Sequence, residues 1–128
     1  MLMSALKSSW SAETSYSSDE YEESNPARGQ CVVSSLVVQD YLGGELARAK
    51  VCGDGIDEKH YFNTLPDGLV IDTTRSQYTK PVTMADSPVD FKLDGFESVR
   101  ERLLADDDTR RRYELLKQKV QAKLKENI

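Results

Sequence analysis

The chain has 128 residues, a charged fraction of 30% and a formal net charge of −5. This length fits one domain with a small core, so we expect a single domain over 1–128. The basic run at 110–112 follows the acidic run at 106–108 after a single residue, and nucleic-acid binding needs uncompensated Lys and Arg side chains. The apolar runs are far shorter than the roughly 20 residues of a spanning helix. The sequence therefore predicts no nucleic-acid partner and no membrane insertion.

The two cysteines, Cys31 and Cys52, bear on the compartment. The first seven residues lack a basic region before an apolar stretch, so they do not resemble a signal peptide. Without a secretion signal, we expect free thiols in a reducing cytoplasm rather than a disulfide.

Composition changes divide the chain into four parts. The first part has apolar residues at helical spacing and ends at a tryptophan, and the second is rich in Ser, Glu and Asp. We expect an N-terminal helix at 1–10, an exposed polar loop at 11–24, a core at 25–80, and a loop followed by C-terminal helices at 81–128.

The core opens with a helix that runs from Cys31 to about Tyr41. It is apolar over most of its circumference, which is typical of a helix buried on most sides. A buried strand is the alternative, but the Gly43-Gly44 stop favours the helix. A strand at 45–52, a turn at 53–55 and an exposed polar segment at 56–59 are expected next.

A hairpin gives the clearest local pattern. His60–Asn63 and Leu69–Thr73 are both strand-like, and the segment between them contains Pro66 and Gly68, as a tight turn requires. Antiparallel pairing would bring His60 near Asp72, because opposed or diagonal side chains lie about 5 to 8 Å apart.

The C-terminal part contains a loop at 75–94 with one further strand, a short helix at Phe96–Leu104 and a longer helix from Thr109 to about Lys125. The longer helix carries an apolar stripe at helical spacing. The expected fold is α+β, with a buried central helix packed on a small antiparallel sheet and flanking helices at both ends.

Three residues of the core suggest thiol chemistry. Cys31 lies in the first turn of its helix, where unpaired N–H groups and the helix dipole favour a thiolate nucleophile. His60 is the candidate general base, and Asp72 would orient its imidazole. Gln30 and the Cys31 backbone N–H are candidate oxyanion donors, and Gly29 leaves room for a substrate backbone. Each residue alone is more often structural, but their conjunction favours a catalytic arrangement.

Several motifs carry a resemblance to a known family. They are Trp10 with Thr14, Asn25-Pro26-x-x-Gly29-Gln30-Cys31, Val37–Glu45, His60-Tyr61-x-Asn63, Asp67-Gly68, Asp72-x-Thr74-x-x-Gln77 and Arg112–Leu116. In these residues the chain resembles the YunG-like family of small bacterial proteins. The Cys–His–Asp order also resembles the papain-like and transglutaminase-like superfamily, which implies a nucleophile at a helix start with His and Asp on adjacent strands.

The resemblance implies Cys31 as nucleophile, His60 as base and Asp72 as orienter. Asn63 and Gln77 match family motif positions, and we place them among the candidate substrate-binding residues without an individual role. Phe62 and the Ser34-Ser35 pair depart from the family pattern, but neither departure removes a member of the triad.

The expected function is a cysteine-dependent hydrolase or acyl transferase, without a cofactor, acting on an amide, isopeptide or thioester bond of a peptide-like or acyl substrate. The alternative is a non-enzymatic interaction module, or an inactive descendant of the same fold, that docks through its acidic loop and basic C-terminal helix. A third hypothesis is a structural zinc site formed by Cys31, Cys52, His60 and Asp72, although their spacing matches no common zinc motif. The substrate and the oligomeric state stay open.

Overall fold

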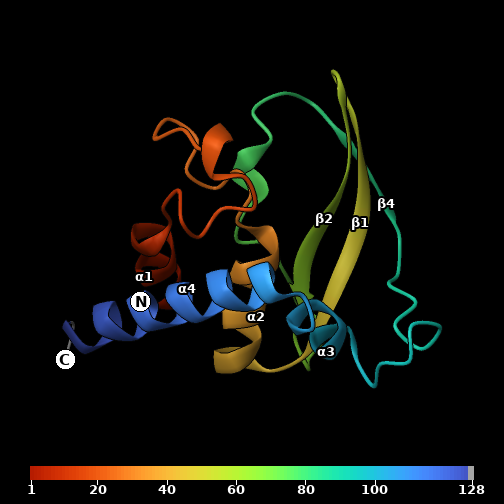
Figure 1. Cartoon of the computed structure of the whole chain (residues 1–128). Coiled ribbons are helices and arrows are strands. Elements are labelled where there is room, and N and C mark those ends of the chain that lie inside the picture. Colours follow the sequence, from red (N-terminus) through yellow and green to blue (C-terminus); the bar gives the residue numbers. More distant parts are fainter. Residues whose placement is uncertain (127–128) are drawn as a thin grey trace.

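The computed structural model describes residues 1–126 and has an α+β fold (Figure 1). No helix among these residues is long and apolar enough to cross a membrane. The elements, in chain order, are α1 (Leu2–Ser9), η1 (Ser18–Glu20), α2 (Cys31–Leu42), β1 (Glu45–Gly53), β2 (Ile56–Thr64), β3 (Val70–Ile71), η2 (Arg75–Gln77), β4 (Thr83–Asp86), α3 (Val99–Leu104) and α4 (Asp107–Glu126).

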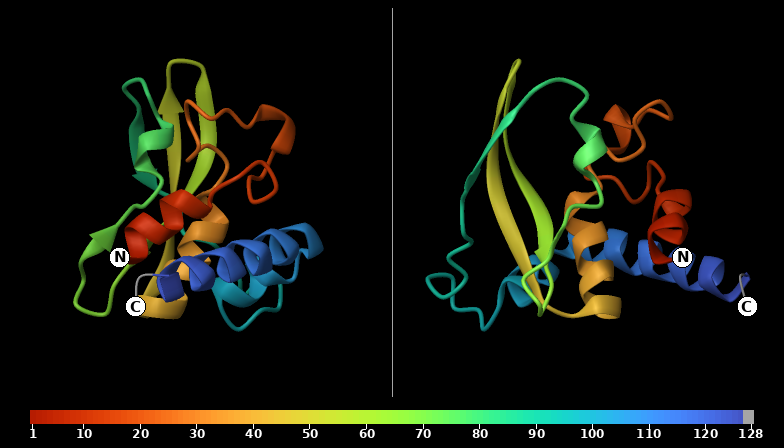
Figure 2. Two further views of the ribbon diagram at one scale, coloured as in Figure 1. Left: turned by 90° about the vertical axis from the view of Figure 1, so that its left-hand side faces the viewer. Right: turned by 180° about the vertical axis from the view of Figure 1, so that it is seen from behind.

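The sheet is antiparallel, curled and four-stranded, with the order β3-β2-β1-β4. Its centre is the long β1–β2 hairpin, which reaches beyond the helices in both further views (Figure 2). Gly53 pairs with Ile56, so the hairpin turn is Asp54-Gly55, and both residues have positive φ. This is the backbone of a two-residue type I′ turn, which matches the twist of the flanking strands.

Helix α2 lies between the sheet and helices α1 and α4 (Figure 1). It contacts β2 on one side and α4 on another. Val33, Leu36 and Val37 are fully buried, as the apolar pattern predicts. Gly43 ends the helix with a φ of 74°, and its N–H donates to the carbonyl of Gln39. The helix prediction for this segment is therefore confirmed, and the alternative strand is wrong.

Helix α4 covers the far side of α2. Its buried residues Tyr113, Leu116 and Val120 recur every three or four positions and form the stripe expected from the sequence. Helix α1 packs against α4, so the first helix and the last lie side by side (Figures 1 and 2). The predicted N-terminal helix is confirmed.

Three local predictions need correction. The segment 11–24 is not exposed throughout, because Thr14 and Ser15 are buried against the start of α2. Residues 56–59, expected as an exposed polar segment, form the first half of β2 and pair with β1, with Ile56 and Glu58 partly buried. The β3 strand keeps only Val70–Ile71, and Asp72 follows its end.

The short helix of the C-terminal part also begins later than expected. It starts at Val99 rather than Phe96, because Ser98 caps it by accepting a hydrogen bond from the Glu101 N–H.

Candidate functional site

Cys31 is the first residue of α2 and is partly exposed as a free thiol. The backbone N–H groups of a first helical turn have no acceptor within the helix, so they can donate to an anion. Gln30 precedes the helix with its own backbone already near helical angles. The sequence-based placement of Cys31 at a helix N-terminus is confirmed.

His60 and Asp72 meet across the predicted hairpin. The imidazole Nε2 lies 2.8 Å from Asp72 Oδ2, and the imidazole is fully buried. The backbone N–H of Thr74 donates to the other carboxylate oxygen at 3.3 Å, which fixes the orientation of Asp72. The sequence prediction that the hairpin joins these two side chains is therefore correct.

The thiol of Cys31 completes this group. Burial lowers the pKa of His60, but hydrogen bonds with Asp72 and with Cys31, and the charges of both, raise it to about 9. Two acidic partners therefore stabilise the imidazolium more than burial destabilises it. Contact between α2 and β2 brings Cys31 to His60 from 29 positions earlier in the chain.

Gln77 favours the uncharged form of the same imidazole, whereas Asp72 and Cys31 favour the charged form. Its Nε2 donates to His60 Nδ1 at 3.2 Å and to Thr74 Oγ1 at 3.3 Å. Its Oε1 accepts from Arg28 Nη1 at 3.3 Å, and this partner assigns which end of the amide faces His60. A nitrogen that accepts a hydrogen bond carries no proton, so Gln77 favours the neutral imidazole with its proton on Nε2, toward Asp72.

A second group of residues, not singled out from the sequence, supports Gln77. Arg28 and Glu58 form a two-pronged ion pair with distances of 2.7 and 2.8 Å. Tyr78 donates to Glu58 at 3.0 Å and packs edge-on against His60. Glu58 lies two residues before His60, so both point to one face of β2. This spacing was missed from the sequence because 56–59 was expected to be an exposed polar segment rather than part of a strand.

Two predicted substrate-binding residues have structural partners. The amide of Gln30 is buried and bonded at both ends, accepting from Thr14 at 2.8 Å and donating to the Ser11 carbonyl at 3.0 Å. Asn63 is fully buried and donates to the Ser35 carbonyl, which ties β2 to α2. These contacts leave the roles of Gln30 and Asn63 in substrate binding as predictions.

Gly29 has a backbone conformation that residues with a side chain rarely adopt. Its φ is +80°, and a Cβ there would lie 2.2 Å from Ser15 Oγ. The Cβ side of Gly29 is therefore occupied by Ser15 of the 11–17 loop. Gly29 also lines the pocket beside Cys31, so its role in leaving room for a substrate stays a prediction. The Gly29 carbonyl accepts from the Tyr16 N–H at 2.8 Å, which seats that loop beside the site.

A pocket of about 470 Å³ opens next to Cys31. Tyr16 of the 11–17 loop, Val32 of α2 and Tyr61 of β2 contribute to its walls, and Arg112 of α4 also lines it. This volume lies within the range of small-molecule sites, about 300 to 1,000 Å³. The thiol is thus the member of the Cys–His–Asp group that faces a pocket.

Among residues 1–126, no group of three or more His, Cys, Asp or Glu side chains could hold a metal ion. Cys52 lies near the β1–β2 turn, where its sulfur donates weakly to Asp57 at 3.8 Å. The structure gives the zinc hypothesis no ligand cluster within the part of the chain that it describes.

Comparison with known proteins gives a family. The family model for the YunG protein matches residues 1–125. A relative from Bacillus subtilis (strain 168), "Uncharacterized protein YunG", is 38% identical over 78 residues, and this match covers 60% of each chain. The chain thus matches less than two thirds of the length of that relative. No solved structure matches significantly. The chain belongs to the YunG protein family.

Proposed function

We propose that this protein is a cysteine-dependent hydrolase or acyl transferase that acts on an amide, isopeptide or thioester bond. The observation that supports it most is the buried His60 imidazole, held by Asp72 at 2.8 Å and interacting with the Cys31 thiol at the pocket. An imidazole oriented by a carboxylate is the usual activator of a nucleophilic thiol.

In the first half-reaction the Cys31 sulfur attacks the substrate carbonyl carbon. A carbon–sulfur bond forms. The thiol proton already resides on His60 near neutral pH, because Asp72 stabilises the charged imidazole and the pKa of His60 is raised to about 9. The oxyanion of the tetrahedral intermediate would lie against the free backbone N–H groups at the start of α2. When the intermediate collapses, the bond to the leaving nitrogen or sulfur breaks, and the leaving group takes the proton from His60.

In the second half-reaction the acyl group leaves Cys31. Water or an amine attacks the thioester carbonyl and gives its proton to His60. The carbon–sulfur bond then breaks, and the sulfur leaves as a thiolate beside the protonated His60. The choice between water and an amine separates a hydrolase from a transferase.

The same proposal includes two finer points. The order Cys31, His60, Asp72, with the cysteine at a helix start and the other two on a hairpin, is the arrangement that a papain-like or transglutaminase-like core would imply. A reducing cytoplasm would keep Cys31 a free thiol, and this location stays a prediction.

The test is alkylation of the native protein by iodoacetamide between pH 5 and pH 10, with each cysteine read by mass spectrometry. Cys52 is the internal control, because it is also a partly exposed free thiol but has no imidazole partner. We expect Cys31 to react at least about tenfold faster than Cys52 at pH 6, and His60→Ala to remove the difference. Incubation with p-nitrophenyl acetate should leave an acetyl group on Cys31.

A Cys31 that reacts no faster than Cys52, with or without His60, would refute the catalytic proposal. Circular dichroism of His60→Ala and of the milder Asp72→Asn checks that the fold survives each change. If the catalytic proposal is refuted, the non-enzymatic interaction module becomes the better hypothesis, and a search for a partner protein would follow.

A further inference from the structure

The pocket beside Cys31 contains charged side chains, but they are compensated. Arg28 is paired with Glu58 through two contacts below 3 Å, and Arg112 is paired with Asp108 at 2.9 Å. The remaining lining charges, Lys59 and Glu20, have opposite signs. An electrically balanced pocket offers an ionised ligand no net attraction to offset its loss of water. The pocket therefore suits an uncharged group.

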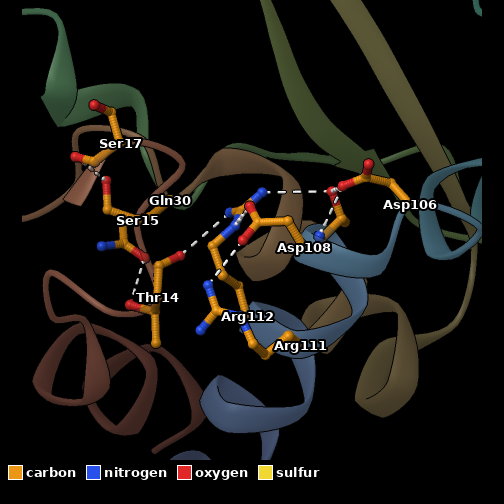
Figure 3. A network of polar contacts seen from close by, with 9 residues as sticks. Thr14, Ser15, Ser17, Gln30, Asp106, Asp108, Arg111 and Arg112 are labelled. Atoms are coloured by element: carbon orange, nitrogen blue, oxygen red, sulfur yellow. Dashed lines mark hydrogen bonds and ion pairs between the residues drawn. The ribbon is translucent and has the colours of Figure 1, made fainter.

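Arg112 is an unusual support for a pocket wall. Its side chain is only 3% exposed, although it lies on a helix rich in solvated Arg and Lys residues. It donates to Asp108 at 2.9 Å and, from Nη1, to the Thr14 carbonyl at 3.4 Å. Figure 3 shows it reaching from α4 to the 11–17 loop. The guanidinium is thus fixed in place on both sides.

Tyr16 rests on this fixed guanidinium. The Arg112 carbon Cζ lies 5.6 Å from the Tyr16 ring centroid, a cation–π contact. The Tyr16 backbone N–H is bonded to the Gly29 carbonyl, directly before the nucleophile's helix. Yet the residue is 77% exposed. An aromatic ring that is held on one side and open on the other presents a pre-organised stacking surface.

We propose that Tyr16 is a specificity-determining residue, and that the substrate group seated beside Cys31 is uncharged and aromatic. The group would lie against the Tyr16 ring, with Val32 and Tyr61 supplying the apolar part of the pocket wall. This inference rests on the proposed role of Cys31 as nucleophile. A reactive sulfur at the pocket would attack only groups that the pocket first holds.

Three alkylating probes test it on the native protein. Iodoacetamide is small and neutral, iodoacetanilide adds an uncharged phenyl ring, and iodoacetate is anionic. All three react by forming a bond between the cysteine sulfur and the CH₂ carbon while iodide leaves. Rates at Cys31 and Cys52 are read from the same samples, so differences in intrinsic reagent reactivity cancel in their ratio.

We expect the ratio of the iodoacetanilide rate to the iodoacetamide rate to be about threefold to tenfold higher at Cys31 than at Cys52. The rate of Cys31 with iodoacetanilide should also saturate at high reagent concentration. Tyr16→Ala should remove this preference by raising the half-saturating concentration of iodoacetanilide. Tyr16→Phe should keep the preference because it keeps the ring. Tyr41→Ala removes a partly exposed tyrosine at the other end of α2 and should change nothing.

Equal preferences at the two cysteines, preferred iodoacetate, or an unchanged preference in Tyr16→Ala would each overturn the aromatic assignment. If Cys31 reacts quickly with iodoacetamide in a His60-dependent way but shows no aromatic preference, only this inference fails. If Cys31 does not react with any of the three probes, the proposed function and this inference are both refuted.

Discussion

The charge of the site can be measured directly, because His60 is the only histidine of the chain. Its pKa of about 9 depends on Asp72 and Cys31 acting against burial. Asp72→Asn keeps an oxygen that can accept the Nε2 proton but removes the negative charge. We expect the pKa of His60 to fall by one unit or more in this variant, because burial remains and its effect is to lower the value.

The size of the effect follows from the ordinary histidine pKa of 6.5. A rise to about 9 corresponds to roughly 3 kcal/mol, at about 1.4 kcal/mol per unit. Because the folded-state value is the higher one, this stabilisation is fully present below pH 6.5 and is lost as the pH rises through 9. Wild-type protein should therefore unfold more easily in urea at pH 10 than at pH 6, and His60→Gln should lose less stability over that range.

The assay is an NMR titration of the imidazole C–H signals of His60. Asp57→Asn, an exposed carboxylate elsewhere on β2, is the control and should leave the midpoint unchanged. Cys31→Ser separates the thiol's contribution and should also lower the midpoint. A wild-type midpoint at or below 6.5, or a midpoint that Asp72→Asn does not move, would refute this account of the site.

Three further predictions concern the scaffold. Gly29→Ala should lower the free energy of unfolding in urea by about 2 kcal/mol or more, because its Cβ would clash with the 11–17 loop. Gly55 has a similar φ but open space around it, so Gly55→Ala is the control and should cost only about 1 kcal/mol. Equal costs would contradict the clash. Leu116→Ala should cost about 2 to 5 kcal/mol, because the side chain is fully buried, and a loss under 1 kcal/mol would mean that α4 is loosely packed. Burial and a hydrogen bond to Asp40 raise the pKa of Tyr113 to about 12, so Asp40→Asn should lower it in an ultraviolet titration.

Much of the fold was predictable because it depends on local patterns. The apolar circumference of 31–42 and its glycine stop identified α2, and the turn at 64–68 identified the hairpin that joins His60 to Asp72. The errors occurred where polar residues take structural roles. Segment 56–59 is a polar strand because it pairs with the rest of a hairpin, and part of 11–24 is buried because Gln30 needs hydrogen-bond partners.

The sequence by itself determined the helix that begins at Cys31 and the hairpin contact between His60 and Asp72, since both rest on spacing within about a dozen residues. Only the tertiary structure decided that Cys31 meets His60, that Gln77 reaches the imidazole, and that Tyr16 lies over Arg112 beside the pocket. These contacts join segments separated by 17 to 96 positions. Local periodicity carries no information about them, because they depend on how α2 and α4 pack against the sheet and the 11–17 loop.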